Sequence, residues 1–365
     1  MAFLDLDRLS VAFKKEQVLK EASLQVERGE TVVVFGPSGG GKTVLLRLVS
    51  GVMQPDSGDV RLNGHSILDQ GPEERGVGMA FQNFALYPHM PAFENIASPL
   101  RARRLADSEI ERRVHETARL LKIDHVLKHF PRELSNGQKQ RTALGRALIA
   151  GPEVLLLDDP LRNVDAKLRY EMRIELPRLL KSFGGSVLYV TQDYKEAMAL
   201  GDRVAVLLDG RFLQIDRPAE IYKNPADVRI ARLFGDPTIN LYPVQPRPAG
   251  NGVEIELFGS RITLPGSHGH LQGKECLMGL RPEHIHVHTE PVDGGLPMEL
   301  DAVTPLNVRT VLFLRTQDNR ELLATCSEHE QGNFGRGHRA VHARIDFERA
   351  LFFEPASGIR LPAAA

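Results

Sequence analysis

The alternation of hydrophobic and polar residues divides the chain into parts with different expected structure. Residues 1 to about 80 have the pattern of short strands closed by turns, including the β-branched run Thr31–Phe35 and the run Val60–Leu62, which ends at the hairpin dipeptide Asn63-Gly64. Residues 95 to 150 are helical in character, and residues 153 to 236 return to short apolar strands, Val154–Leu157 and Val187–Val190, with helical stretches between and after them. Apolar runs of this length between helices predict a buried parallel sheet.

Two helix starts have the pattern of a capping box, a serine followed three residues later by Glu or Gln. Ser108 with Glu111 predicts one helix, and Ser135 with Gln138 predicts another. The free N–H groups at such a start can attract an anion. On the residues alone, Ser135 is either an anion site or an ordinary helix start.

A boundary is expected near Gly235-Asp236-Pro237, because three further prolines, Pro243, Pro246 and Pro248, predict a stiff linker. Beyond it the pattern is strand after strand with Gly and Pro between, which predicts a small antiparallel barrel. We therefore expect two domains, residues 1–236 and 237–365. The expected strands are Val253–Phe258, Glu275–Leu280, His284–His288, Val308–Leu314, Leu322–Cys326 and Ala340–Ile345.

Composition excludes several classes of protein. The 365 residues carry 46 Lys+Arg and 47 Asp+Glu, a net charge of −1, so no whole-chain field exists to hold nucleic acid, and we expect no nucleic-acid partner. No apolar run approaches the roughly 20 residues that cross a bilayer. The two cysteines, Cys276 and Cys326, cannot make a disulfide framework, and the first ten residues lack the pattern of a secretory signal. We expect a protein of the reducing cytosol.

A glycine-rich segment matches the phosphate-loop pattern G-x-x-x-x-G-K-[ST]. An apolar strand leads into it and a helical pattern follows, which is the context that such a loop needs. Backbone N–H groups can wrap a phosphate only where side chains do not intervene. Lys42 would reach the β- and γ-phosphates of ATP, and the Thr43 hydroxyl would bind Mg²⁺. The predicted ATP-binding residues of the loop are Gly36, Pro37, Ser38, Gly39, Gly40, Gly41, Lys42 and Thr43.

Two carboxylates, Asp158 and Asp159, follow the apolar run Val154–Leu157. Ligands of open α/β sheets bind at the carboxyl ends of the strands. Asp158 would hold Mg²⁺, because hard cations prefer carboxylate oxygens, and Asp159 stands where a base for the attacking water is needed. Without other signals, the two residues would indicate a surface acidic pair that ends a strand. Because the chain also has a phosphate loop, we favour the interpretation as metal ligand and catalytic base.

Five motifs in this order resemble those of the ATP-binding cassette (ABC) ATPases. Two segments, Phe81–Met90 (FQNFALYPHM) and Gly279–His284 (GLRPEH), look specifically like the maltose-type sugar importer ATPases, and the similarity covers nearly the whole chain. The five motifs are the phosphate loop Gly36–Thr43, Phe81–Met90, Leu134–Arg141 (LSNGQKQR), Leu155–Asp165 (LLLDDPLRNVD) and Tyr189–Asp193 (YVTQD).

The resemblance implies a fold and a set of roles. The expected fold is α/β, a P-loop NTPase domain of the ABC type with a helical subdomain, followed by a small all-β, OB-like (TOBE-type) barrel that regulates or stabilises a dimer. Phe13 would stack on adenine, and Gln82 would sense the metal and the γ-phosphate. Two cassettes pair head to tail in this family, so the signature residues would act in trans on the opposite site. The signature residues are Ser135, Asn136, Gly137 and Gln138.

The sequence departs from the family pattern at four positions. Asp159 replaces the catalytic Glu, Gln192 replaces the switch His, Asn136 replaces the first Gly of the signature, and Arg162 replaces a usual Ser. A carboxylate shortened by one methylene loses about 1.5 Å of reach, and a neutral amide cannot carry a proton. We expect ATP binding to survive and hydrolysis at this chain's own site to be slow, either in an asymmetric heterodimer with an intact ATPase, which we favour, or in a slow homodimer.

The resemblance also implies a function and partners. The expected function is the energy-coupling ATPase subunit of an importer for a carbohydrate or polyol, with ATP and Mg²⁺ as cofactors, at the cytoplasmic face of the inner membrane. Its partners would be two integral membrane permease subunits, a second ABC ATPase and, indirectly, a substrate-binding protein. The alternative is a cassette that serves as a nucleotide-dependent regulatory or assembly switch; the importer-like segment after Gln82 argues against it.

Overall fold

The computed structural model describes residues 2–14, 16–249, 252–306, 309–316, 318–334 and 339–362. The chain separates into two compact units, Met1–Ile221 and Tyr222–Ala365. The domain limits expected from the sequence, 1–236 and 237–365, stay a prediction. In the described part of the chain, no helix is both long and apolar enough to cross a membrane.

The centre of the first unit is a six-stranded sheet, as the apolar runs predict. Its order is β10-β9-β3-β8-β7-β6, in which β9, β3, β8, β7 and β6 run parallel and β10 is an antiparallel edge. Strands β3 and β7 are buried at every position, as expected for central strands covered on both faces. The strands are β3 (Thr31–Phe35), β6 (Val77–Ala80), β7 (Val154–Asp158), β8 (Ser186–Thr191), β9 (Arg203–Leu208) and β10 (Arg211–Asp216).

The register of this sheet brings the carboxyl ends of four strands to one edge. Phe35 at the end of β3 pairs with Thr191 at the end of β8, and Asp158 at the end of β7 pairs with Val190. The end of β6, Ala80, pairs with Leu157. The loops that leave these strands therefore start side by side.

An antiparallel sheet of four strands, ordered β2-β1-β4-β5, completes the first unit's β-structure. The predicted hairpin is confirmed: β4 and β5 are joined by Asn63-Gly64, with φ of 51° and 79°, the left-handed pair of a type I′ turn. The strands are β1 (Leu4–Phe13), β2 (Glu16–Val26), β4 (Ser57–Leu62) and β5 (His65–Ser66).

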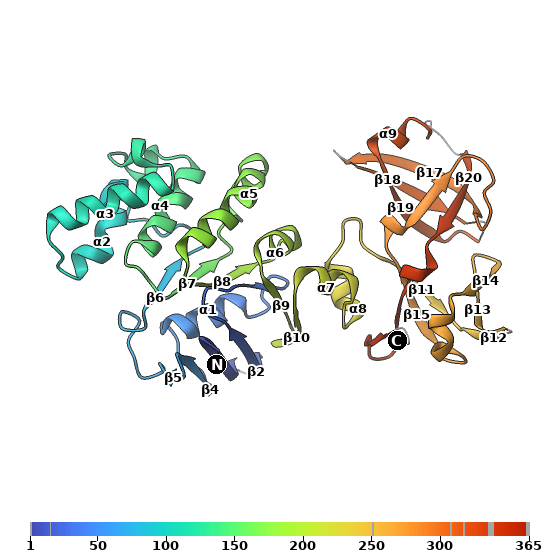
Figure 1. Ribbon diagram of the computed structural model, residues 1–365, viewed down its shortest axis with the longest axis horizontal. Helices are drawn as coiled ribbons and strands as arrows, with labels where there is room; N and C mark the ends of the chain where they lie inside the picture. The colour runs from blue at the N-terminus through green and yellow to red at the C-terminus, as the bar shows by residue number, and fades with distance from the viewer. Residues whose placement is uncertain are drawn as a thin grey trace. The chain divides into compact units, whose positions relative to one another are not determined.

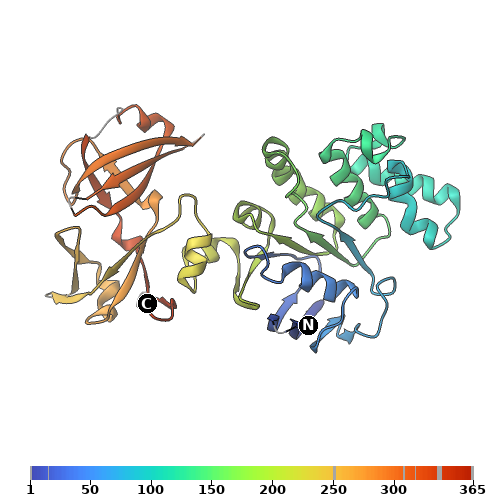
Figure 2. The same cartoon turned by 180° about the vertical axis from the view of Figure 1, so that it is seen from behind.

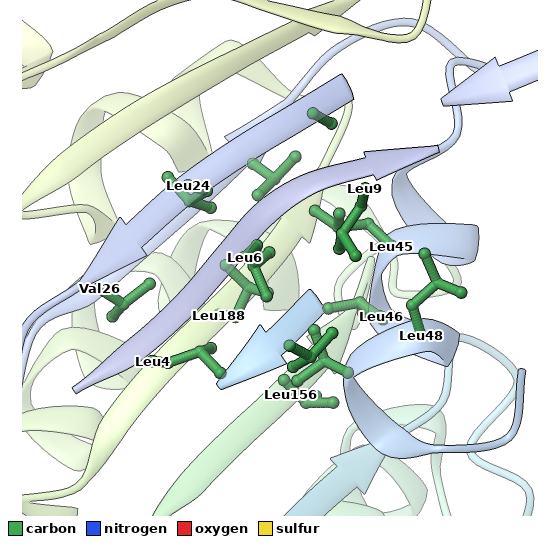
Figure 3. Packing of buried hydrophobic residues seen from close by; sticks show 14 of the residues in the cluster. Leu4, Leu6, Leu9, Leu24, Val26, Leu45, Leu46, Leu48, Leu156 and Leu188 are labelled. Atoms are coloured by element: carbon green, nitrogen blue, oxygen red, sulfur yellow. The ribbon is translucent and has the colours of Figure 1, made fainter. Parts of the chain in front are cut away.

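The main core of the first unit lies where the two sheets and helix α1 (Lys42–Ser50) meet (Figure 3). Leucines of β1 such as Leu6 pack with Leu46 of α1 and Leu188 of β8, and all three are fully buried. Helix α1 covers one face of the parallel sheet, and α5 (Ala166–Phe183) and α6 (Tyr194–Leu200) cover the other (Figures 1 and 2). The core thus fixes the helix that begins at Lys42.

Helices α2 (Ala92–Ala102), α3 (Asp107–Leu120) and α4 (Asn136–Leu148), with 3₁₀ turns at Asp124–Val126 and Pro131–Glu133, form the segment between β6 and β7. The capping box predicted at Ser108 is wrong: α3 starts at Asp107 and has no side-chain cap. Asp107 and Glu109 instead place negative charge in the first turn. The capping box at Ser135 is confirmed.

The second unit is built mainly of antiparallel strands around a shared core, with short helices at its start. Its sheets have the orders β11-β15-β21-β22, β12-β13-β14 and β16-β20-β17-β18-β19. Helix α7 (Pro218–Lys223) crosses the division between Ile221 and Tyr222. Helices α8 (Val228–Leu233) and α9 (Glu328–Gln331) belong to the second unit, and its 3₁₀ turns lie at Gly266–Leu271, Pro282–His284 and Phe347–Arg349. The strands are β11 (Asn240–Val244), β12 (Arg247–Ala249), β13 (Gly252–Leu257), β14 (Ser260–Leu264), β15 (Cys276–Leu280), β16 (Ile285–His288), β17 (Leu296–Leu306), β18 (Arg309–Arg315), β19 (Glu321–Ser327), β20 (Arg339–Ile345), β21 (Leu351–Phe353) and β22 (Arg360–Leu361).

The proline-rich linker predicted after residue 237 is wrong. Pro243 lies in β11 opposite Leu277, and Pro248 lies in β12 opposite Val253. Both are edge strands, where a residue without an N–H donor costs no ladder hydrogen bond on its open side. The six predicted strands are present within a few residues; Val308, the predicted start of one, lies outside the described residues.

Candidate functional site

The glycine-rich loop leaves β3 and enters α1, and its glycines are required by the backbone. A Cβ at Gly36 would lie 2.3 Å from the carbonyl oxygen of Leu207, and Gly39 and Gly41 have φ of 80° and 91°. Lys42 is 8% exposed, and its Nζ donates hydrogen bonds to the carbonyl oxygens of Gly36 at 2.8 Å and Pro37 at 2.6 Å. The loop is therefore folded around the ammonium, which keeps a third donor for a ligand.

Thr43 and Asp158 meet at the start of α1. The Thr43 hydroxyl donates to Oδ1 of Asp158 at 3.0 Å, and burial raises the pKa of the Asp158 carboxyl. A hydroxyl and a carboxylate oxygen at this spacing fit the hard-oxygen preference of Mg²⁺. The described residues contain no group of three or more His, Cys, Asp or Glu side chains that could hold a metal. A divalent cation at Asp158 would thus take its remaining ligands from Thr43, water and nucleotide phosphates.

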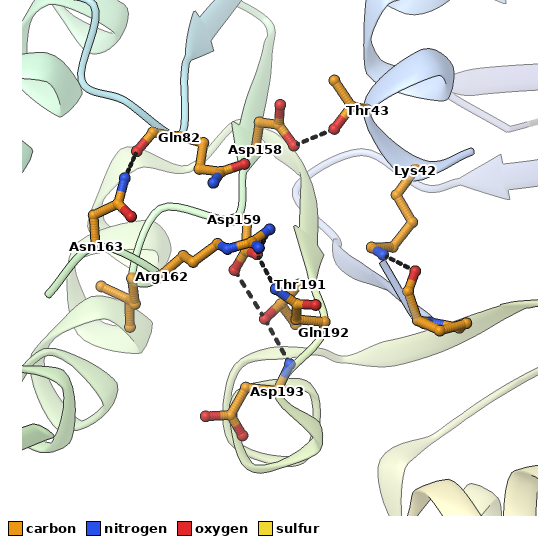
Figure 4. A network of polar contacts seen from close by, with 12 residues as sticks. Lys42, Thr43, Gln82, Asp158, Asp159, Arg162, Asn163, Thr191, Gln192 and Asp193 are labelled. Atoms are coloured by element: carbon orange, nitrogen blue, oxygen red, sulfur yellow. Dashed lines mark hydrogen bonds and ion pairs between the residues drawn. The ribbon is translucent and has the colours of Figure 1, made fainter. Parts of the chain in front are cut away.

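Asp159 stands at a bend directly after β7, with a left-handed φ of 43° that is uncommon for residues other than glycine. Its carboxylate accepts a hydrogen bond from Nε2 of Gln192 at 3.2 Å, and the Thr191 hydroxyl lies 3.5 Å away (Figure 4). Burial raises the pKa of Asp159, while the charges of Arg162 and Lys42 oppose that rise. The acid is therefore held beside the loop in an environment suited to a general base.

The structure brings most of the predicted site residues around one cavity of about 280 Å³. The sequence interpretation did not include three apolar residues that also line it, Val18, Val44 and Val190. Phe13, predicted to stack on adenine, is 44% exposed and lines this cavity. The predicted residues that line the cavity are Phe13, Ser38, Gly39, Gly41, Lys42, Thr43, Gln82, Asp158, Asp159 and Gln192, together with Arg162.

The signature segment forms the N-terminus of α4. Ser135 is its N-cap: the Ser135 hydroxyl accepts from the N–H of Gln138 at 3.3 Å, and Oε1 of Gln138 accepts from the N–H of Ser135 at 2.9 Å. A Cβ at Gly137 would lie 2.4 Å from Leu168. The described lining of the Lys42 cavity does not include these residues. Their predicted action on a partner's nucleotide stays a prediction.

Asn136 occupies the first helical position of α4, where the backbone is right-handed. The backbone conformation at this position is one that any residue can adopt, so a glycine is not required here. Its side-chain amide lies 3.4 Å from the carbonyl oxygen of Asn163, whose own amide donates to the carbonyl oxygen of Gln82 at 3.0 Å. The Gly-to-Asn departure is accommodated without backbone strain.

Two residues that the sequence interpretation missed hold the segment after Gln82. Buried Asn95 accepts from the N–H of Tyr87 at 2.7 Å and donates to the carbonyl oxygens of Tyr87, Met90 and Pro91. Arg146 donates to the carbonyl oxygens of Ala85 and Phe84, which both have positive φ. No local sequence signal marks either residue, because Arg146 acts on backbone 61 and 62 residues away and Asn95 acts on irregular backbone just before its own helix.

A glycine-wrapped lysine and paired carboxylates at the carboxyl edge of a parallel sheet define a P-loop nucleotide-binding protein. The sequence model of the family described as "ABC transporter" matches residues 19–162. The chain is 43% identical over 306 residues to the sn-glycerol-3-phosphate import ATP-binding protein UgpC of Escherichia coli strain K12, covering 83% of this chain and 85% of the relative. UgpC of Shigella sonnei strain Ss046 matches to the same extent. The chain belongs to the ABC transporter ATPase family.

Two solved structures share the nucleotide-binding fold. The ATP-binding cassette MJ0796, bound to ADP and Pi in a post-hydrolysis dimer, has a TM-score of 0.54 and 28% identity over 59% of this chain and 98% of its own. CbiO1 of Clostridium perfringens, part of the transporter complex cbiONQ, has a TM-score of 0.56 and 25% identity over 60% and 90%. The protein is therefore an ATP-binding ATPase of the transport-coupled class.

Proposed function

We propose that this chain is the energy-coupling ATP-binding subunit of an importer for a carbohydrate, a polyol or a polyol phosphate. The observation that supports it is the extent of its similarity to an sn-glycerol-3-phosphate import ATP-binding protein. The matched stretch of 306 residues is longer than the first unit, Met1–Ile221, so it extends into the second unit as well. Similarity confined to the nucleotide-binding unit would indicate only the ATPase class.

The site residues have the following proposed roles. The loop Gly36–Thr43 binds the phosphates of ATP, Phe13 stacks on adenine, and Asp158, Thr43 and Gln82 contact Mg²⁺, directly or through water. The ion would screen the negative charge of the phosphates. Asp159 orients and deprotonates the attacking water, and Gln192 contacts the γ-phosphate.

Hydrolysis at this chain's own site is proposed to be slow. Asp159 has a shorter reach than the glutamate of the family pattern, and Gln192 cannot carry the charge of a histidine. We propose that the chain pairs head to tail with a second, intact ABC ATPase, whose nucleotide is closed by Ser135, Asn136, Gly137 and Gln138 of this chain. The pair would work on two membrane permease subunits at the cytoplasmic face of the inner membrane, and indirectly with a substrate-binding protein.

Affinity purification from native membranes tests the assembly. We expect the tagged chain to co-purify with two integral membrane proteins and a second cassette ATPase, identified by mass spectrometry. Recovery with no integral membrane protein would instead favour a regulatory or assembly switch. Calorimetry with Mg·ATP on the purified chain should show binding that Lys42→Ala abolishes, since Lys42 organises the whole loop.

Turnover measurements distinguish the two forms of pairing. The chain purified alone should hydrolyse ATP slowly, and addition of the co-purified ATPase should raise turnover well beyond the sum of the separate rates. Magnesium-dependent turnover of the chain alone at the level of its partner would contradict the asymmetric pair and leave a homodimer.

A further inference from the structure

Arg162 is a second cation in the nucleotide cavity. The cavity is lined by two cations, Lys42 and Arg162, and by two acids, Asp158 and Asp159. Lys42 already donates two of its three hydrogen bonds to carbonyl oxygens of the loop. Beside Lys42 and the proposed Mg²⁺, Arg162 is thus a further positive charge that a triphosphate in this cavity would meet.

The backbone of Arg162 is fixed while its guanidinium remains available. The N–H of Arg162 donates to the carbonyl oxygen of Asp159 at 3.2 Å, and its own carbonyl oxygen accepts from Arg169 at 3.2 Å. Nη1 of Arg162 lies 3.9 Å from Oδ2 of Asp159, beyond hydrogen-bond distance, and the side chain is 44% exposed. Within the described part of the chain, this ion pair is the guanidinium's one recorded polar contact. Its donors are thus not committed to the protein.

The direction of the side chain places those donors at the catalytic end of the cavity. Figure 4 shows Arg162 extending back toward Asp159, beside Gln192 and opposite Lys42. A guanidinium in this position faces the space between the general base and the phosphate-binding lysine.

We infer that Arg162 binds the terminal phosphate of ATP in this chain's own site and makes the site prefer ATP over ADP. The inference rests on the proposed nucleotide-binding function. A guanidinium presents paired N–H donors that match two phosphate oxygens, and such charge-assisted bonds are stronger than those of neutral groups. The positive charge that Gln192 does not carry is thereby supplied from Arg162, whose guanidinium faces the same carboxylate oxygen of Asp159, Oδ2, as the Gln192 amide does.

Nucleotide affinities of variants test this contact. Calorimetry on the full chain should compare Mg²⁺ with adenylyl imidodiphosphate, a non-hydrolysable analogue with a terminal phosphate, against Mg²⁺ with ADP. For Arg162→Ser we expect affinity for the analogue to fall by about 10- to 100-fold, with ADP affinity unchanged within about twofold. Arg162→Lys, which keeps the charge but not the paired donors, should fall between wild type and Arg162→Ser.

Lys167→Ser is the matched control. Lys167 is exposed, is close in sequence and does not belong to the described cavity lining, so its removal changes the net charge by the same amount. It should leave both affinities unchanged. If Arg162→Ser lowered the affinities for the analogue and for ADP equally, or did not lower the affinity for the analogue, the inference would be overturned. Failure of the wild-type chain to bind either nucleotide would instead refute the proposed function.

Discussion

Asp159 and Gln192, the two residues that depart from the family's catalytic pattern, are hydrogen-bonded to each other. Nε2 of Gln192 donates to Oδ2 of Asp159 at 3.2 Å. Their strands β7 and β8 pair in parallel, with Asp158 opposite Val190, so both side chains leave the sheet at the same edge. The two substitutions therefore act on one site, and variants that restore the family's residues should change both positions together.

Restoring the longer acid should speed hydrolysis. Asp159→Glu extends the carboxylate by about 1.5 Å toward the cavity, and a misplacement of about 1 Å can cost about 100-fold in rate. We expect kcat to rise by about 10- to 100-fold, and to rise further in Asp159→Glu combined with Gln192→His. Phosphate release from the chain at saturating Mg·ATP measures this.

The matched control for that prediction is Asp159→Asn, which keeps the size of the side chain and removes its basicity. Turnover should fall in this variant while the affinity for Mg·ATP stays within about twofold. If Asp159→Glu hydrolyses ATP no faster than wild type, the length of the acid is not what limits this site.

Glu196 should make stability depend on pH. Its side chain is 1% exposed and accepts hydrogen bonds from the hydroxyls of Tyr189 and Thr191, both at 2.8 Å. Burial raises the pKa of Glu196 from 4.5 to about 7, so the folded protein prefers the protonated carboxyl. This stabilisation is fully present below about pH 4.5 and is lost as the pH rises toward 7.

Glu196→Gln removes the titration and keeps the size of the side chain and one oxygen that can accept the hydrogen bonds of Tyr189 and Thr191. The free energy of unfolding of the variant relative to wild type should rise with pH between 4.5 and 7, by up to about 3 kcal/mol, since one pKa unit corresponds to about 1.4 kcal/mol. Urea denaturation at a series of pH values measures it. Glu171→Gln, at an exposed position, is the control and should show no such slope. A difference that does not change with pH would contradict the prediction.

The sequence predicted the parts of this molecule whose signals are local. The loop around Lys42, the strand before Asp158 and the cap at Ser135 are each specified by a few consecutive residues, and the structure has all three. The same local reasoning failed at Ser108, because α3 begins at Asp107 with Ala106 as its N-cap, two residues earlier than a cap at Ser108 would place it. It also failed at Pro243, because whether a proline is tolerated depends on the strand being an edge, which only the sheet order determines.

Residues whose hydrogen-bond partners lie outside their own helix left no pattern to find. Asn95 and Arg146 come from different helices, α2 and α4, and both hold the segment after Gln82 through its backbone. Glu196 stands on α6 and supports Thr191 through a bond that exists only after β8 and α6 have packed. In each case the interaction depends on tertiary structure, and the residue type alone does not indicate it.

Asn95 should be needed for substrate uptake more than for ATP hydrolysis, because it holds the importer-like segment after Gln82. Replacement by Leu leaves the N–H of Tyr87 and the carbonyl oxygen of Met90, both part-buried, without their partner, and each unsatisfied buried group costs about 1–3 kcal/mol. We expect a lower melting temperature and a larger loss of substrate uptake than of ATPase activity. Substrate uptake and ATPase activity, the latter as phosphate release, can both be measured in reconstituted vesicles. The control is Asn83→Ala, an exposed side chain of the same segment, which should change neither. Equal loss of uptake and ATPase activity would mean that Asn95 supports the whole fold and has no separate role in coupling.

Ser135 should have two separable roles, one as a helix cap and one toward a partner's nucleotide. Ser135→Ala removes the acceptor for the N–H of Gln138 and should lower the free energy of unfolding by about 1 kcal/mol. Ser135→Asp caps a helix as well as serine does, so its stability should match wild type. Its negative charge would nevertheless repel a γ-phosphate brought by the second cassette. We therefore expect Ser135→Asp to keep the wild-type melting temperature and to lose ATP-dependent dimerisation with the second cassette ATPase. Size-exclusion chromatography of the two proteins together, with a non-hydrolysable ATP analogue, measures this dimerisation. Wild-type dimerisation by Ser135→Asp would place the signature away from the phosphate and limit Ser135 to its capping role.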